Sequence, residues 1–318
     1  MERAAPQFAA ALAAGEKLVL DGGLASELEG RGFDLADPLW SARVLLEAPA
    51  AIAAVHRDYF RAGARVATTA SYQASLPGLA RRGLGEEEAL GVVRGSVRLA
   101  DRARRGHRAE HPDAPPLFVA GSVGPYGAFL ADGSEYRGNY ALSRDEYLDF
   151  HRPRAAALLE AGADVLACET IPNGDEARAL ADLIAELGAQ AWISVTLRDR
   201  AHLSDGTPLR ELAVELAGRP GVLALGVNCV PPGLADEALG VLAALDASRR
   251  MPLVVYPNAG EGYDAGRKAW TGAAHDAGLL ASRAAGWAAQ GARLMGGCCR
   301  TTPADIAALS RAVRWMDT

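Results

Sequence analysis

The sequence lacks the features that mark secreted, membrane-spanning and nucleic-acid-binding proteins. It has only four cysteines in 318 residues, which are too few and too clustered for a disulfide framework. No uncharged apolar run reaches the roughly 18 residues of a membrane span, and no five like charges stand in a row. The formal net charge of -6 gives no reason to expect nucleic acid or an anionic membrane as a partner. We therefore expect a cytoplasmic protein that acts on small molecules.

One stretch near the N-terminus imitates a signal peptide. It is the alanine-rich run Phe8–Ala14. Alanine is barely apolar enough for such a segment, Glu2 and Pro6 disturb its flanks, and cleavage near Gly15 would cut directly before an expected strand. We therefore expect no secretory signal here.

Short apolar runs alternate with longer helix-period segments along the whole chain, as βα units do. Eight runs are candidate strands: 17–20, 64–69, 117–120, 164–168, 190–196, 222–227, 252–256 and 292–295. Eight segments between and after them are candidate helices: 44–62, 86–105, 144–161, 175–187, 209–216, 234–248, 279–290 and 304–313. Several of these helices end at a glycine suited to a left-handed cap, as at Gly63, Gly162 and Gly291.

Eight strands, each followed by a helix, predict an α/β fold with a (β/α)8 TIM-type barrel. No Ser-, Gly- or Pro-rich linker interrupts the count, so residues 1–318 are expected to form one domain. The alternative is an open doubly wound sheet. Its dinucleotide fingerprint is missing, because Gly22 and Gly23 follow the first strand without the required glycine spacing.

In a barrel the reactive groups lie where strands run into βα loops. Cys229 follows the sixth candidate strand, and Cys298 and Cys299 follow the eighth, so we expect the three thiols to meet at one rim from neighbouring strands. Three thiolates favour zinc and leave a fourth position open, as in catalytic sites. Gly296 and Gly297 would let the chain leave the strand so that both adjacent cysteines reach one metal.

Other interpretations of the cysteines remain open. They could be ordinary buried cysteines, or Cys298 and Cys299 could form a strained vicinal disulfide. Cys168 lies one residue inside its strand and is expected to pack in the core.

Two carboxylates, Asp21 and Glu169, also follow candidate strands. Each could be a helix cap or a solvated loop charge. If both lie beside thiolates, each carboxylate would raise the proton affinity of the other unless a cation lay between them. This arrangement predicts that the substrate carries an ammonium group. Tyr72 is either a core aromatic or a polar group at the mouth. The glycine-rich segment Gly121–Asn139 suits a lid or a donor-binding loop, or is a mobile surface loop.

Several motifs together resemble the homocysteine S-methyltransferase family. They are DGGLASELEG, ATTASYQAS, SVGPYGAFLADGSEYRGNY, ETIPN, GVNC, YPNAGE and GGCCRTTP, in an order and spacing that hold from about Lys17 to the C-terminal helix. DPLWSARVL and TLRDRAHLSDGTPL are most similar to the stand-alone enzymes that use S-methylmethionine or S-adenosylmethionine, whereas betaine-using and cobalamin-dependent relatives fit less well.

The resemblance implies a (β/α)8 barrel with one zinc ion on Cys229, Cys298 and Cys299. It implies that Asp21 and Glu169, with backbone near Gly22 and Gly23, hold the amino-acid head of homocysteine, and it places Tyr72 close to the metal. The expected substrate-binding residues are Asp21, Gly22, Gly23, Tyr72, Glu169 and Asn228. Ala259 departs from the family, where serine is usual.

The implied reaction moves a methyl group from a sulfonium carbon to the homocysteine sulfur and forms methionine. Completing thiol ionisation on a metal contributes about 2 kcal/mol for a thiol of pKa about 8.5, whereas in-line positioning can contribute up to about 7–11 kcal/mol. The cationic donor needs aromatic rings or carboxylates. Trp40, Tyr126 and Tyr136 are candidates, and Arg137 or Arg198 could hold its carboxylate.

Three other functions remain as alternatives: a zinc hydrolase in the same barrel, a methyltransferase acting on another thiol or selenol such as selenocysteine, and a redox-sensing zinc module. The hydrolase is disfavoured because none of the six histidines is expected to end a barrel strand. The sequence does not indicate the oligomeric state or the preferred donor.

Overall fold

Eight parallel strands form the barrel that the sequence predicts. The computed structural model describes residues 5–35, 41–259, 262–264, 269–271 and 278–316. The strands lie in the order β1-β12-β9-β8-β5-β4-β3-β2, and an isolated parallel bridge between Leu20 and Val66 joins the two ends. They are β1 (Leu18–Val19), β2 (Val66–Thr68), β3 (Phe118–Val123), β4 (Val165–Ile171), β5 (Ala191–Val195), β8 (Val222–Asn228), β9 (Leu253–Tyr256) and β12 (Ala292–Met295). Each matches a predicted strand to within three residues at either end.

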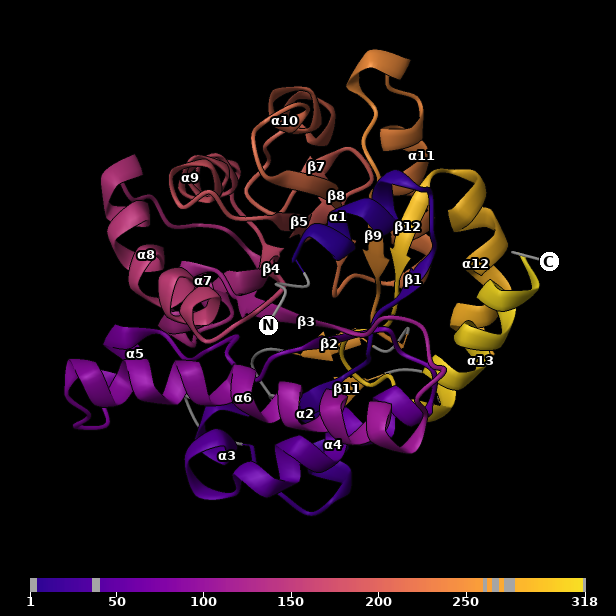
Figure 1. Ribbon diagram of the computed structural model, residues 1–318. Helices are drawn as coiled ribbons and strands as arrows, with labels where there is room; N and C mark the ends of the chain where they lie inside the picture. Colours follow the sequence, from indigo (N-terminus) through magenta and orange to yellow (C-terminus); the bar gives the residue numbers. More distant parts are fainter. Residues whose placement is uncertain (1–4, 36–40, 260–261, 265–268, 272–277, 317–318) are drawn as a thin grey trace.

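Helices surround the ring of strands (Figure 1). They are α1 (Ala5–Ala13), α2 (Leu24–Gly30), α3 (Ser41–Glu47), α4 (Pro49–Arg61), α5 (Leu76–Ala80), α6 (Glu86–Glu110), α7 (Tyr126–Leu130), α8 (Arg144–Glu160), α9 (Gly174–Glu186), α10 (Leu209–Leu216), α11 (Pro232–Ala243), α12 (Leu279–Ala289) and α13 (Pro303–Trp315), with 3-10 turns η1 (Ser134–Tyr136) and η2 (Ala247–Arg249). The predicted glycine caps are confirmed, because Gly63, Gly162 and Gly291 have φ of 100°, 95° and 106°.

Two predicted helices differ from the observed ones. The helix expected over 44–62 is broken at Ala48, whose φ of -144° is not helical, and α4 starts afresh with Pro49 in its first turn. Proline has no N–H to donate, so it fits a first turn but not a helix interior. The helix expected to run to residue 248 ends at Ala243, and only the short turn η2 follows.

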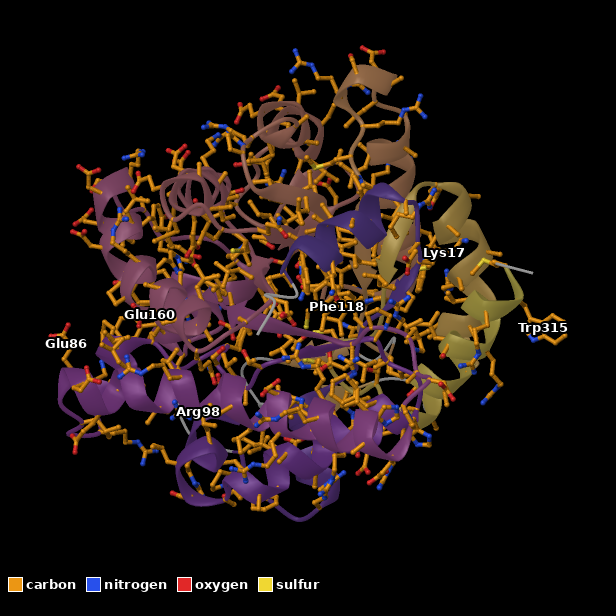
Figure 2. All side chains as sticks on the ribbon, in the orientation of Figure 1. Lys17, Glu86, Arg98, Phe118, Glu160 and Trp315 are labelled. Carbon is orange, nitrogen blue, oxygen red and sulfur yellow. The ribbon has the colours of Figure 1, made fainter. Side chains whose placement is uncertain are left out.

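The core has two layers. The outer layer lies between strands and helices. The inner one fills the barrel with residues from the strands and from α1, including Phe8, Phe118 and Trp192, each no more than 1% exposed. Figure 1 shows α1 lying across the centre of the ring, and Figure 2 shows Phe118 near the centre whereas Glu86 and Trp315 lie at the outer edge. The run that imitated a signal peptide is therefore a helix that closes the amino end of the barrel.

The carboxyl end carries the irregular segments. Hairpins β6 (Leu197–Asp199) with β7 (His202–Leu203), and β10 (Gly262–Asp264) with β11 (Ala269–Thr271), follow β5 and β9. The segment Gly121–Asn139 is not a structureless loop, because it begins inside β3 and contains α7 and η1.

Candidate functional site

Three thiols meet at the carboxyl end of the barrel, as the sequence predicts. The Sγ atoms of Cys229, Cys298 and Cys299 all lie within 4.8 Å of one another, and those of Cys229 and Cys299 are 3.5 Å apart. None of the four cysteines is in a disulfide. Among the described residues these three form the group of His, Cys, Asp or Glu side chains that is arranged to hold a metal ion.

The expectation that strands six and eight are neighbours is wrong. They are β8 and β12, and β9 lies between them. The chain after β9 joins the two cysteine segments, because Cys229 N donates to Tyr256 O (3.1 Å), Cys298 N donates to Pro257 O (2.8 Å) and Ala259 N donates to Cys299 O (3.1 Å). A third strand end therefore acts as a backbone template for the cluster. Ala259 takes part through its backbone, whatever its side chain.

Local backbone geometry aims the thiols at one another. Cys229 has a φ of 52°, a left-handed conformation that non-glycine residues adopt at a cost of roughly 1–3 kcal/mol. After β12 the chain passes close to β1: a Cβ on Gly296 would lie 2.6 Å from Leu20 Cβ, and one on Gly297 would lie 2.3 Å from Thr301 Oγ1. Glycine is required here for close approach, in addition to the freedom to leave the strand.

The cluster has the donor set of a soft metal. Hydrogen bonds with the Cys298 and Cys299 thiols hold the pKa of Cys229 well below its ordinary value, which favours ionisation of one of the three thiols. A divalent cation would deprotonate the other two thiols as it bound. Three sulfurs from the protein leave a tetrahedral ion with one open position. The residues therefore fit a metal ion with an exchangeable fourth ligand.

Cys168 lies apart from this cluster, as expected. Its side chain is 1% exposed in the outer core layer, and burial raises the pKa of its thiol to about 12.

Two buried carboxyl groups lie near the thiols. Asp21 accepts hydrogen bonds from Thr68 N (2.7 Å) and Thr68 Oγ1 (2.9 Å), and Glu169 accepts one from Ser122 Oγ (2.5 Å). Burial raises the pKa of Asp21 to about 8, with the charge of Glu169 adding to the shift. Burial likewise raises the pKa of Glu169 to about 7, with the charge of Cys229 adding to it. The charge of Glu169 acts on Asp21, so the two carboxyl groups are near each other, and a cation between them would favour the ionised form of both.

Gly22 and Gly23 bring the β1 loop against the loop that carries Cys298. A Cβ on Gly23 would lie 2.7 Å from Cys298 O, and one on Gly22 would lie 2.8 Å from Thr301 Oγ1. The N–H of Gly23 is directed at Thr301, at 3.2 Å from its O and 3.1 Å from its Oγ1. These glycines thus join Asp21 to the cysteine loop.

Asn228 locks a bulge beside the acidic pair. Thr170 has a φ of 62°, and the β4–β5 register shifts there. Asn228 Oδ1 accepts from Thr170 N (2.7 Å), and its Nδ2 donates to Thr170 Oγ1 (2.8 Å) and lies 3.9 Å from Cys298 Sγ. One amide therefore fixes the backbone after Glu169 and contacts the thiol cluster.

Tyrosines and one further carboxylate approach the cluster from the β2 and β3 loops. Tyr136 Oη lies 3.5 Å from Cys229 Sγ. Tyr72 bonds to Thr170, and burial raises its pKa well above the ordinary value, with the charges of Glu135 and Cys229 adding to the shift. Sequence reasoning missed Glu135, because a single glutamate in a glycine-rich segment has no periodic or spacing signal. Its place between Ser134 and Tyr136 was the one available hint.

The other donor-binding candidates lie elsewhere or outside the described residues. Tyr126 packs among Phe129, Tyr140 and Phe150, with ring centroids 5.0–5.6 Å apart, and Trp40 is not among the described residues.

The two arginine candidates are engaged at the surface. Arg137 pairs with Asp132 (3.6 Å), and Arg198 lies 3.5 Å from Asp199.

Five of the six histidines can be placed. His202 lies in the short hairpin strand β7, not at the end of a barrel strand, and contacts Asp199 rather than the thiols. His56 and His151 lie in helices, as does His107, with His111 at the end of α6. His275 lies outside the described residues.

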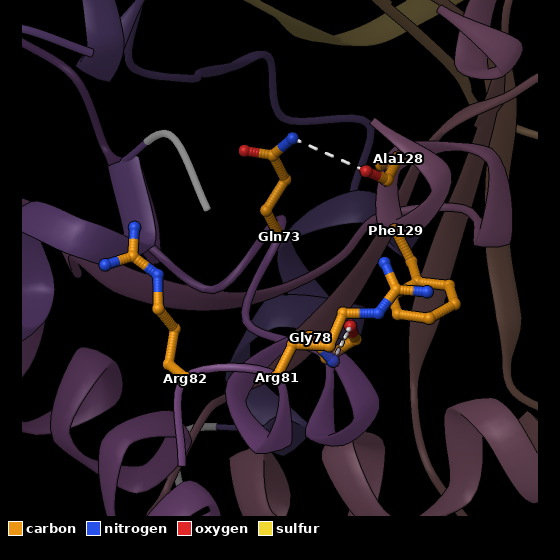
Figure 3. A pocket seen from close by; sticks show the side chains of 7 residues that line it. Gln73, Gly78, Arg81, Arg82, Ala128 and Phe129 are labelled. Carbon is orange, nitrogen blue, oxygen red and sulfur yellow. Dashed lines mark hydrogen bonds between the residues drawn. The ribbon is translucent and has the colours of Figure 1, made fainter. Parts of the chain in front are cut away.

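A separate cavity of about 240 Å³ opens beside the rim between α5 and α7 (Figure 3). Its lining residues are Gln73, Ser75, Gly78, Arg81, Arg82, Ala128 and Phe129. The Arg81 guanidinium stacks 4.0 Å from the Phe129 ring centroid, and Gln73 Nε2 lies 3.5 Å from Ala128 O. No thiol lines this cavity, so it is distinct from the candidate metal centre.

Comparison with known proteins places this geometry in a family. The sequence profile of the family described as homocysteine S-methyltransferase matches residues 18–313. The chain belongs to the homocysteine S-methyltransferase family. It is 57% identical to "Homocysteine S-methyltransferase" of Escherichia coli (strain K12), over 92% of this chain and 94% of that one. Among the described residues, no helix is both long and apolar enough to cross a membrane.

Two further relatives of this homocysteine S-methyltransferase family member bear on the metal and the acceptor. The solved structure titled homocysteine methyltransferase MmuM from Escherichia coli, metallated form, superposes with a TM-score of 0.85 at 53% identity, covering 95% of this chain and 98% of that one. "Selenocysteine Se-methyltransferase" of Brassica oleracea var. italica is 41% identical, over 92% of this chain and 88% of that one.

Proposed function

We propose that this protein transfers a methyl group from a sulfonium donor, S-methylmethionine or S-adenosylmethionine, to the sulfur of homocysteine and so forms methionine. The observation that carries the proposal is the meeting of three thiols with two buried carboxyl groups at one rim. The thiols suit a metal that binds a substrate sulfur, and the carboxyl groups suit the ammonium of an amino acid. Homocysteine has both groups.

The proposed cofactor is one zinc ion per chain on Cys229, Cys298 and Cys299. When bound, zinc holds the substrate sulfur as a thiolate at neutral pH. Three anionic ligands suit this task better than neutral histidines, because they leave the bound sulfur electron-rich. Asn228 would steady one of these ligands through its contact with Cys298.

The protein's own residues position the acceptor. Asp21 and Glu169 would bind the homocysteine ammonium, and the charge of that cation would offset the burial that raises both pKa values. Gly22 and Gly23 would hold the head group close to the cysteine loop, and Tyr72 would cover the reacting sulfur. Because ionisation accounts for only about 2 kcal/mol, positioning by these residues must contribute most of the rate enhancement.

The test is zinc content together with homocysteine-dependent loss of a sulfonium donor. We expect about one zinc per chain and methionine formation only when homocysteine is present. Turnover of donor without homocysteine would indicate a hydrolase, and bound zinc without turnover would indicate a sensor. Comparing kcat/KM for the two donors identifies the preferred one.

Selenocysteine is a second candidate acceptor, because a relative named for it is 41% identical over most of its length. Comparing kcat/KM for homocysteine and selenocysteine with one donor decides between them. We expect homocysteine to be the better acceptor.

A further inference from the structure

Glu135 places an unpaired carboxylate oxygen beside the thiol cluster. Its Oε2 atom is buried and has no hydrogen-bond partner among the residues the structure describes. The charge of Cys229 acts on it more strongly than that of any other ionisable group. Its position is well fixed, because Glu135 O accepts a hydrogen bond from Thr196 Oγ1 (3.2 Å) and a Cβ on Gly127 would lie 2.7 Å from Glu135 N.

Burying such a group is costly unless a cation comes to it. Burial raises the pKa of Glu135 to about 7, and the charges of Cys229 and Asp132 add to the shift. The charge of Arg137 reaches Glu135, but the Arg137 guanidinium is bonded to Asp132, to the carboxylate at 3.6 Å and to the carbonyl oxygen at 2.9 Å. The protein therefore leaves Glu135 with incomplete compensation, which favours binding of a cation from outside.

Two tyrosine side chains lie near Glu135 or near the thiol cluster. Tyr136 follows Glu135 directly and reaches to 3.5 Å from Cys229 Sγ. Tyr72 is close enough to Glu135 for the carboxylate charge to act on its hydroxyl. The faces of tyrosine rings attract organic cations, and more strongly in a desolvated site. A buried carboxylate with two tyrosines nearby suits a bulky cation that carries little hydration.

We propose that Glu135, with Tyr72 and Tyr136, binds the positively charged sulfur of the methyl donor and selects cationic donors over neutral thioethers. The inference rests on the proposed function and adds the donor side of the site. The site then has two acidic regions: Asp21 and Glu169 bind the ammonium of the acceptor, and Glu135 binds the sulfonium of the donor.

The charge change in the reaction decides which kinetic constant Glu135 affects. The bond between the donor sulfur and its methyl carbon breaks, and its electron pair stays on the donor sulfur, which becomes a neutral thioether. The homocysteine thiolate supplies the pair for the new sulfur–carbon bond. The donor's positive charge therefore falls on the way to the transition state, so Glu135 attracts the bound donor more than the transition state. It should lower the donor KM without raising kcat.

The test compares Glu135→Gln with wild type in the zinc-loaded enzyme. We expect the donor KM to rise by at least about tenfold, with kcat unchanged or higher and with homocysteine KM and zinc content unchanged. Glu160→Gln is the matched control, because it makes the same change of carboxylate to amide at the end of α8, on a side chain that is 66% exposed and that pairs with Arg94 rather than with Glu135 or Arg137. It should leave the donor KM within about twofold of wild type.

Calorimetry with S-methylmethionine and with methionine adds a readout independent of turnover. Glu135→Gln should weaken binding of S-methylmethionine by a similar factor but leave binding of methionine, which lacks the sulfonium charge, unchanged. Equal weakening of both ligands, or an unchanged donor KM, would overturn the proposal. Loss of zinc from the variant would also overturn it, by assigning Glu135 to the thiol cluster. Failure of the proposed function would instead appear as wild-type enzyme that forms no methionine.

Discussion

The two ends of the barrel differ in what fills them: apolar side chains pack at the amino end, whereas polar and ionisable groups gather at the carboxyl end. At the amino end α1 inserts Phe8 against Phe118 and Trp192, with ring centroids 5.2 and 6.2 Å apart. At the carboxyl end, the ends of β1 and β4 carry buried carboxyl groups and those of β8 and β12 lead into thiols, and the backbone is left-handed at Thr170 and Cys229. Apolar packing stabilises the fold at one end, whereas the other end retains groups that cost stability until a ligand arrives. Substitutions at the two ends should therefore affect different measurements.

The largest effect should come from the thiol cluster. Cys298→Ala or Cys299→Ala leaves two sulfurs, so we expect zinc retention and activity to be lost altogether. The metal-free forms of variant and wild type should melt at nearly the same temperature, because both side chains are partly exposed. Metal analysis and thermal denaturation measure the two effects. Activity that survives either substitution would refute the assignment of these ligands.

At the opposite end, Phe8→Ala should affect stability alone. Removing a fully buried ring from the inner core should lower the free energy of unfolding by about 3–5 kcal/mol. The KM values of both substrates should stay the same, because Phe8 lies at the end away from the thiols. Gln7→Ala on the exposed side of the same helix is the control and should change stability by less than about 0.5 kcal/mol. A change in KM for Phe8→Ala would contradict the separation of the two ends.

Within the carboxyl end, Glu169→Gln separates binding of the acceptor from binding of zinc and of the donor. The amide keeps the shape of the carboxylate but removes its charge, so the homocysteine KM should rise by about 10–100-fold. Zinc content and donor KM should not change, since Glu169 is proposed to bind only the acceptor's ammonium. Steady-state kinetics with each substrate varied in turn measures this. An unchanged homocysteine KM would remove Glu169 from the acceptor site.

A pH dependence of the stability of the metal-free protein is a further expected difference between the two ends. The pKa values of Asp21 and Glu169 are raised from 3.8 and 4.5 to about 8 and about 7. The folded state therefore holds more protons than the unfolded state between about pH 4 and 8, and the free energy of unfolding should fall as the pH rises through this window. The slope is at most about 1.4 kcal/mol per pH unit for each group.

Asp21→Asn tests the origin of that slope. Without the carboxylate, the metal-free variant should lose less stability than wild type between pH 5 and pH 8, and it should bind homocysteine more weakly. Thermal denaturation across this range gives the slopes. Equal slopes for the two proteins would show that Asp21 is not the titrating group.

The sequence predicts the barrel well because its strands are short apolar runs between glycines and helix-period segments. It predicts the meeting of Cys229 with Cys298 and Cys299 because parallel strands share one carboxyl end. The sequence does not predict that the chain after β9 holds the two cysteine segments together. This chain acts through the backbone oxygens of Tyr256 and Pro257, so no side-chain pattern reveals it. The sequence prediction also misses the break at Ala48, where Pro49 was the available signal.

Glu135 illustrates the other limit of sequence reasoning. The role of an isolated carboxylate depends on the residues near it in space. For Glu135 these are Tyr72 and Cys229, which are 63 and 94 residues away in the sequence. The role of α1 was hidden for a similar reason, because an alanine-rich run with one phenylalanine does not reveal that Phe8 enters the barrel.

X-ray absorption at the zinc edge, with and without homocysteine, tests the central claim most directly. We expect about three sulfur ligands and one lighter ligand in the free enzyme, and about four sulfur ligands after homocysteine is added. Protein purified without chelators that contains no zinc, or a sulfur count that homocysteine leaves unchanged, would contradict the proposal that three protein thiolates hold a metal open to the substrate sulfur.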